Sequence, residues 1–144
     1  MSLDGAYDEA NIFAKIVRGE APCARIYEDD DAIAFLDLFP QSRGHTLVIS
    51  KTAKARNLLD IEPAALQALI VSTQKVAKGL RAALNPDGIV MVQYNGAPAG
   101  QTVFHLHFHL IPRFEGTPVP GHGAAKMADT VELAELAREI AGKI

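Results

Sequence analysis

The chain has 144 residues, of which 49% are hydrophobic, and it carries a net charge of −3 at pH 7 with a pI near 5.9. This length allows one domain with a substantial hydrophobic core and is too short for two ordinary domains, so we expect a single domain over residues 1–144. The slight acidity argues against a broad cationic surface, which excludes a nucleic-acid polymer as an expected partner and still allows one pocket for a small phosphorylated ligand.

The expected compartment follows from cysteine usage and from the N-terminus. Cys23 is the only cysteine, so the sequence offers neither an intrachain disulfide nor a cysteine framework for a metal. The first residues are acidic and lack the basic and apolar regions of a signal peptide, and no apolar run reaches the length of a membrane span. We therefore expect a cytoplasmic protein without a membrane partner.

The first half of the chain predicts one short helix and three strands. Apolar residues recur at helical spacing over 12–17 and stop before Gly19, which is typical of a short amphipathic helix. The segments 25–28 and 32–36 flank an acidic turn and predict a β-hairpin. The apolar run 46–49 predicts a third strand.

The second half predicts a long helix, two strands and a C-terminal helix. An amphipathic pattern covers 63–84, with a proline suited to the first helical turn. Strands are expected at 89–93 and 103–111, and Asp129 is a suitable cap for a helix that follows a connector of prolines and glycines. Because the strands cluster in hairpins, we predict an α+β fold in which helices pack on a mainly antiparallel sheet.

Three of the five histidines lie in one predicted strand. His105, His107 and His109 alternate with apolar residues, so they share one face of the strand, with neighbouring rings about 7 Å apart. A neutral imidazole is a competent nucleophile toward phosphorus, and a protonated neighbour can neutralise a phosphate oxygen or donate a proton to a leaving group. One strand can therefore supply both roles.

Two other interpretations of these histidines compete with phosphate chemistry. A set of satisfied structural histidines is disfavoured because each buried ring would need polar partners. A catalytic zinc is the sharper alternative, since His-x-His on a strand suits a metal. An anion is favoured over a metal because the glycine-bearing loop 95–102 runs straight into the strand, and because no carboxylate lies between Asp87 and Glu115.

The segment His105-Leu-His-Phe-His-Leu-Ile resembles the motif of the histidine triad (HIT) family, in which histidines alternate with apolar residues. The resemblance extends in family order over about residues 11–114, leaving a C-terminal loop and helix at 115–144. The blocks that carry it lie at 12–20, 27–30, 34–37, 44–49, 99–105 and 111–113.

The resemblance implies a role for each histidine of the motif. His107 would be the nucleophile that forms a nucleotidyl-histidine intermediate, and His109 would bind phosphate oxygens. His105 would orient the His107 ring. His45, from the block at 44–49, would add a contact near the phosphate.

The resemblance also implies a set of nucleotide-binding residues. Asp37 matches the ribose-binding position, and Phe35 and Leu38 would line the pocket for the base. The phosphates would be bound by the loop before the triad. Its implied ligands are Asn95, Gly100, Gln101 and Thr102.

Departures from the family pattern affect the metal and the loop. Bacterial relatives often bind a structural zinc at positions that here are Asn11, Ala14 and Ala53, so we expect no metal and no other cofactor. Tyr94 replaces the first of two asparagines before the loop, and its role is open. His122 has no clear counterpart, and we expect it to be solvated.

The expected function is attack of His107 on the α-phosphate of a purine nucleotide or nucleotide conjugate, with nucleoside phosphoramidates and dinucleoside polyphosphates as the competing substrate classes. The alternatives are a nucleotide-binding sensor with little turnover and a metallohydrolase that uses the histidine strand. The family fold implied here is a five-stranded sheet with a long helix and flanking helices, usually paired into a two-fold homodimer.

Overall fold

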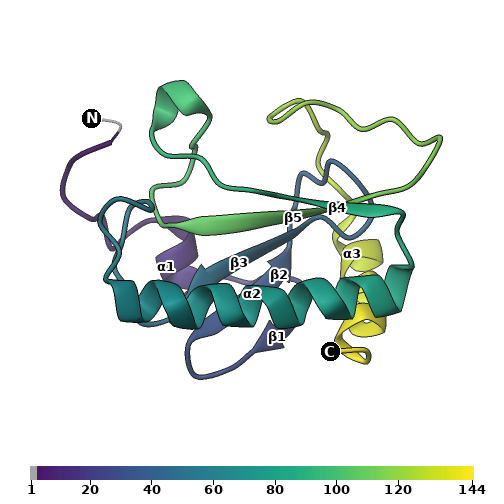
Figure 1. The fold of residues 1–144 in the computed structure, drawn as a ribbon, viewed down its shortest axis with the longest axis horizontal. Helices are drawn as coiled ribbons and strands as arrows, with labels where there is room; N and C mark the ends of the chain where they lie inside the picture. Colours follow the sequence, from purple (N-terminus) through teal and green to yellow (C-terminus); the bar gives the residue numbers. More distant parts are fainter. Residues whose placement is uncertain (1–2) are drawn as a thin grey trace.

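Five strands form one fully antiparallel sheet in the computed structural model, which describes residues 3–144 (Figure 1). Their order across the sheet is β1-β2-β3-β5-β4, so β5 lies between two neighbours and β4 forms an edge. The strands are β1 (Arg25–Glu28), β2 (Ala32–Leu36), β3 (Thr46–Ser50), β4 (Gly88–Val92) and β5 (His107–Arg113). The α+β class predicted from the clustering of strands is confirmed.

Three α-helices begin where the sequence offers capping groups. The Asn11 side chain accepts a hydrogen bond at the start of α1 (Ile12–Val17), and the Asp129 carboxylate accepts two at the start of α3 (Thr130–Ala141). The long helix α2 (Pro63–Leu84) has the predicted bounds. It ends at Asn85, whose φ of 48° is left-handed, and a proline follows.

The two faces of the sheet are covered differently. On one face, α2 and α3 bury apolar side chains that include Val48, Phe108 and Leu110 of the sheet. On the other face, the small helix α1 packs Phe13 and Ile16 against β2 and β3. Because α1 is only six residues long, it covers only part of that face (Figure 1). His107 and His109 of β5 line a cavity there.

The histidine strand is shorter than predicted at its start. It begins at His107, which pairs with Ile49 of β3, whereas the sequence predicted a strand from Val103. The backbone N–H of Leu106 donates to the carbonyl of Ala55, outside the sheet, at 2.9 Å. The chain therefore joins the sheet only after residue 106, and His105 precedes the strand.

The edge strand β4 leaves apolar side chains exposed. Val90 and Met91 are 39% and 46% exposed, and no strand pairs with the outer side of β4 within the part of the chain that is described. An unpaired edge with apolar residues is suited to association with another chain.

None of the helices described over residues 3–144 is long and apolar enough to cross a membrane.

Candidate active site

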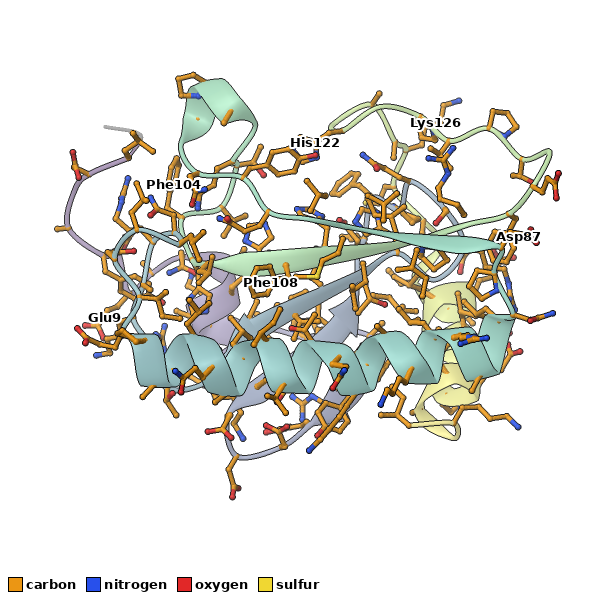
Figure 2. All side chains as sticks on the ribbon, viewed as in Figure 1. Glu9, Asp87, Phe104, Phe108, His122 and Lys126 are labelled. Carbon is orange, nitrogen blue, oxygen red and sulfur yellow. The ribbon has the colours of Figure 1, made fainter. Side chains whose placement is uncertain are left out.

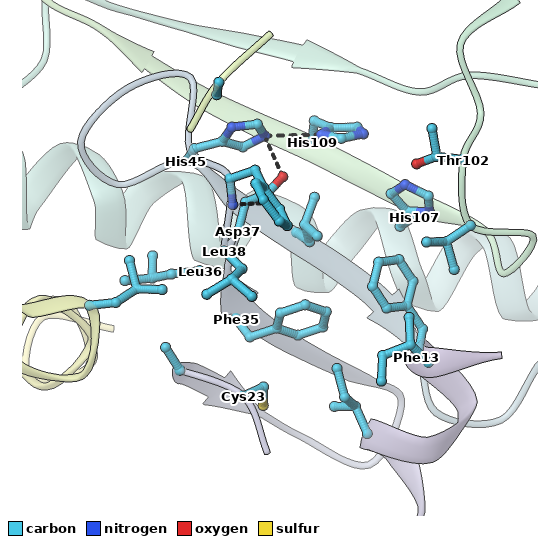
Figure 3. A pocket seen from close by; sticks show the side chains of 18 of the residues that line it. Phe13, Cys23, Phe35, Leu36, Asp37, Leu38, His45, Thr102, His107 and His109 are labelled. Atoms are coloured by element: carbon cyan, nitrogen blue, oxygen red, sulfur yellow. Dashed lines mark hydrogen bonds and ion pairs between the residues drawn. The ribbon is translucent and has the colours of Figure 1, made fainter. Parts of the chain in front are cut away.

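A cavity of about 960 Å³ opens on the face of the sheet that carries the histidines. Its walls come from α1, β2, the loop after β2, the start of β5 and the segment that leads into α3 (Figure 3). Seven predicted site residues line it together, although they come from four separate segments of the chain. They are Phe35, Asp37, Leu38, His45, Thr102, His107 and His109.

The His107 ring is held in one tautomer by the backbone. Its Nδ1 lies 2.7 Å from the carbonyl oxygen of His105. Because a carbonyl oxygen only accepts, Nδ1 carries the proton, and the Nε2 lone pair is left free. Burial lowers the pKa of His107. Its ring packs at nearly a right angle to the Phe13 ring, with the ring centres 4.9 Å apart. His107 is therefore a neutral imidazole with one unprotonated nitrogen at the cavity.

A hydrogen-bond chain fixes the protons on two further histidines. The backbone N–H of Gln41 donates to Nδ1 of His45 at 3.0 Å, so the proton of neutral His45 is on Nε2. That Nε2–H donates to Nδ1 of His109 at 3.0 Å, which places the remaining proton of His109 on its Nε2 (Figure 3). This Nε2 is buried and has no partner among residues 3–144. An unpartnered buried donor at a cavity indicates a ligand that accepts.

The three buried histidines of the cavity, His45, His107 and His109, are neutral near pH 7. Burial lowers the pKa of His45 to about 4 and that of His109 to about 3. Asp37 Oδ2 lies 3.4 Å from His45 Nε2, and burial raises the pKa of the Asp37 carboxyl. The site therefore offers imidazole N–H donors and one carboxylate, rather than a set of cations.

The His105 side chain lies outside the cavity. Its Nε2 donates to the Ser50 carbonyl at 3.3 Å, and its Nδ1 accepts from the Tyr7 hydroxyl at 2.6 Å. These two partners occupy both ring nitrogens. The predicted orienting of His107 is therefore carried by the backbone carbonyl of residue 105, not by its imidazole.

The Gln101 side chain holds the loop before the triad in shape. Its Nε2 donates to the carbonyls of Arg56 and Val103, at 2.6 and 3.0 Å, and its Oε1 accepts from the backbone N–H of Gly96 at 2.8 Å. Gln101 is 3% exposed and does not line the cavity. The sequence suggested that this amide would donate to phosphate, but its donors are already used within the protein.

The other predicted loop residues divide between support and binding. Asn95 accepts the backbone N–H of Leu58 at 2.9 Å, so its side chain braces a neighbouring loop outside the cavity. Gly100 has a φ of +117°, a conformation that favours glycine, and it also lies outside the cavity wall. Thr102 is exposed and lines the cavity beside His107 (Figure 3).

Comparison with known proteins places this site in a family. The model of the HIT domain matches residues 18–116. The chain belongs to the HIT family. Over 97% of its length it superposes on all of a HIT-like protein involved in cell-cycle regulation from Bartonella henselae, solved with an unknown ligand, at 47% identity and a TM-score of 0.90.

Two further relatives bear on the chemistry of this HIT domain. A zinc-bound histidine triad family protein from Mycobacterium smegmatis is 36% identical with a TM-score of 0.76, and the match covers 92% of this chain and 94% of that one. Adenylylsulfatase HINT3 from Arabidopsis thaliana is 38% identical over 104 residues, which are 72% of this chain and 52% of the plant protein.

One group of side chains in the HIT domain could hold a metal ion. Ligand atoms of Asp37, His45 and His109 lie within 4.8 Å of one another. Two histidines and a carboxylate are ordinary zinc ligands. A metal at this position would compete with the proton that joins His45 Nε2 to His109 Nδ1.

The apolar end of the cavity includes residues that the sequence did not single out. Ile12, Phe13 and Ile16 of α1 line it, together with Cys23 from the segment before β1. The helical spacing of these apolar residues predicted that they would pack against the sheet. It did not show that the same face also lines a cavity. Burial raises the pKa of the Cys23 thiol, so the thiol stays protonated and acts as a small apolar residue in the cavity wall.

The expectation that the His122 side chain is solvated holds but is incomplete. Its ring is exposed, yet it lines the cavity and stacks on Tyr94 with ring centres 4.2 Å apart and an angle of 25° between planes. Its Nε2 donates to the Gly100 carbonyl at 2.6 Å, and the centres of the His122 and His109 rings are 5.6 Å apart. The spacing of residues in the sequence could not show that the segment after β5 folds back to the cavity.

Proposed function

We propose that this protein is a nucleotide hydrolase or nucleotidyl transferase that acts at the α-phosphate through a covalent intermediate on His107. The observation that carries the proposal is the pairing of two ring nitrogens at the cavity. His107 presents an unprotonated Nε2, and the neighbouring His109 presents an unpartnered Nε2–H, with ring centres 5.0 Å apart. A nucleophile beside a donor for phosphate oxygens is what attack on phosphorus requires.

The reaction has two balanced steps. In the first, the Nε2 lone pair of His107 forms a P–N bond, and the bond from phosphorus to the leaving group breaks with its electron pair going to that group. An amine leaving group takes its proton from solvent, because neutral His109 would become an imidazolate if it gave up its Nε2–H, and a phosphate leaves as an anion. In the second step, the oxygen of water bonds to phosphorus, the P–N bond breaks with its electron pair returning to His107 Nε2, and the proton that water loses goes to solvent. A different acceptor in place of water gives nucleotidyl transfer.

The shape and polarity of the cavity support a nucleotide as the substrate. One end is apolar, with Phe13 of α1 and Phe35 of β2, and suits a planar base. The Asp37 carboxylate lies beside His45, between Phe35 and the His45–His109 pair, and suits the ribose hydroxyls (Figure 3). The plant relative is named an adenylylsulfatase, which is an enzyme, and this supports an enzyme over a sensor.

The direct test is turnover against a panel of adenylated and guanylated substrates. The panel pairs phosphoramidates with dinucleoside polyphosphates of the same base, and it is run with purified wild-type protein. Release of the nucleoside monophosphate from at least one class is the expected result. Tight nucleotide binding with no release from any member would favour the sensor function instead.

We expect Asp37→Ala to weaken nucleotide binding more than phosphate binding. Each lost charge-assisted hydrogen bond to a ribose hydroxyl should cost about 1.5–3 kcal/mol. Because Asp37 Oδ1 also accepts the backbone N–H of Phe39 at 2.9 Å, Asp37→Asn is the matched variant that keeps this acceptor. Calorimetric titration with AMP and inorganic phosphate measures both losses, and equal losses for the two ligands would place Asp37 outside the ribose site.

A metallohydrolase is the second candidate, supported by the cluster of Asp37, His45 and His109. We expect a chelator to leave turnover unchanged, because both histidines already have assigned partners and His109 serves the phosphate. Metal analysis of the purified protein and rates before and after chelation provide the measurement. Stoichiometric zinc, with activity lost on its removal and restored on its return, would establish the metal mechanism in place of this one.

We expect a homodimer in solution. The unpaired edge β4 carries the exposed Val90 and Met91, and α2 carries the exposed Ile70 and Val71, so apolar surface is available for a two-fold interface. Light scattering at micromolar concentration should give twice the chain mass, and Met91→Lys should shift the population toward the monomer. A monomer for the wild-type protein would contradict this expectation.

A further inference from the structure

The segment between β5 and α3 forms a wall of the cavity. Its two ends are fixed by backbone N–H donors: that of Glu115 bonds to the Asp87 carboxylate at 2.7 Å, and that of Ala128 bonds to the Leu38 carbonyl at 2.8 Å. Between these anchors, His122, Gly123 and Ala125 line the cavity. The segment thus carries the imidazole of His122, which is labelled in Figure 2, to the cavity wall.

The rings follow an order that places His122 beyond the phosphate-binding histidine. The distance between ring centres is 4.9 Å from Phe13 to His107, 5.0 Å from His107 to His109, and 5.6 Å from His109 to His122. The base end of the cavity lies at Phe13. A nucleotide with its base there and its α-phosphate between His107 and His109 therefore directs whatever follows the α-phosphate toward His122.

This part of the cavity lacks the usual cations for a second phosphate. Among the described residues that line it, none is lysine or arginine. His45, His107 and His109 are buried, whereas the side chain of His122 is exposed to water. His122 is thus the lining histidine that can bind a second phosphate at the least cost in desolvation.

We propose that His122 is a specificity residue that binds the phosphate following the α-phosphate, so that the site favours substrates whose leaving group is itself a phosphate over those whose leaving group is an amine. The proposal rests on the function proposed above and selects between its two substrate classes. Tyr94 is the positioning residue, because its ring stacks on the imidazole and holds its plane.

The hydrogen bond to the loop defines how His122 would act. Its Nε2–H is already donated to the Gly100 carbonyl, so Nδ1 is the nitrogen left for a ligand. Nδ1 donates to a phosphate oxygen only when it also carries a proton, and a neighbouring phosphate favours that cationic form. The packing is tight enough to fix the ring, since a Cβ on Gly100 would lie 3.1 Å from His122 Cδ2 and 3.2 Å from Tyr94 Cδ1.

The test compares binding of ADP and AMP, which differ by the phosphate in question. Calorimetric Kd values are measured for the wild type and for His122→Ala, His122→Gln and His122→Arg. Glutamine keeps an N–H for the Gly100 carbonyl without a charge, whereas arginine keeps a charge and a planar group that can stack on Tyr94. Lys126→Ala is the matched control, because Lys126 lies on the same segment outside the cavity wall (Figure 2).

We expect the wild type to prefer ADP, and we expect the ratio of the two Kd values to fall about tenfold in the alanine and glutamine variants. The arginine and Lys126→Ala variants should retain the preference, and AMP should bind all of them alike. Full retention by glutamine would reduce His122 to a structural contact and overturn the proposal, as would loss in the arginine variant or equal losses for AMP and ADP. A wild type that binds both nucleotides without preference would overturn it while leaving the proposed function intact, and one that binds neither would refute the proposed function itself.

Discussion

Replacing His107 by asparagine should slow the chemical step by about 10³-fold or more while nucleotide binding survives. Asparagine retains a polar group near the His105 carbonyl but has no nitrogen lone pair that can attack phosphorus. The neighbouring groups are unchanged, since His109 receives its hydrogen bond from His45 and not from residue 107. Single-turnover rates and calorimetric Kd values for AMP, measured on the same preparations, separate the two effects.

The covalent intermediate gives this prediction a second readout. Brief reaction of the wild type with labelled substrate, followed by rapid denaturation and mass spectrometry, should place the nucleotide on His107, and the label should be absent from His107→Asn. His109→Asn is the matched variant in the same strand, and it should weaken phosphate binding and leave measurable turnover. Label on another residue, or near-normal turnover by His107→Asn, would overturn the mechanism.

Most of the fold could be predicted because it follows from local patterns. The bounds of α2 are set by Pro63 at its first turn and by Asn85 and Pro86 after its end, which are signals carried by neighbouring residues. The same holds for Asp129 at the start of α3. The start of β5 was misplaced because strand pairing depends on the partner, and the backbone of Leu106 bonds to Ala55 instead of to β3.

The site was predicted less completely, because alternation along a strand does not determine hydrogen-bond partners. His107 and His109 face the cavity together, while His105 is held by Tyr7 and Ser50. Gln101 has the donors that a phosphate site needs, but tertiary contacts use them. His122 lies 13 residues after His109 in the sequence, and it reaches the cavity only because the segment after β5 turns back toward it.

Acid should destabilise this protein steeply, and this is the second large effect that we expect. Burial lowers the pKa of His45 and His105 to about 4 and that of His109 to about 3, from an ordinary value of 6.5. Below pH 6.5 these histidines become protonated in the unfolded chain but stay neutral in the folded protein. The free energy of unfolding therefore falls as the pH falls toward 4. Each histidine that stays neutral contributes a slope of about 1.4 kcal/mol per pH unit.

Urea unfolding at pH values from 7.5 to 4.5 measures this slope. Asp37 acts in the opposite direction, because burial raises the pKa of its carboxyl, and it offsets part of the loss. His105→Gln isolates one contribution: whatever it does to stability at pH 7.5, it should reduce the slope by about 1.4 kcal/mol per pH unit. A free energy of unfolding that stays level between pH 6.5 and 5 would mean that the buried imidazoles accept protons in the folded state, and the neutral hydrogen-bond chain from Gln41 through His45 to His109 would then be wrong.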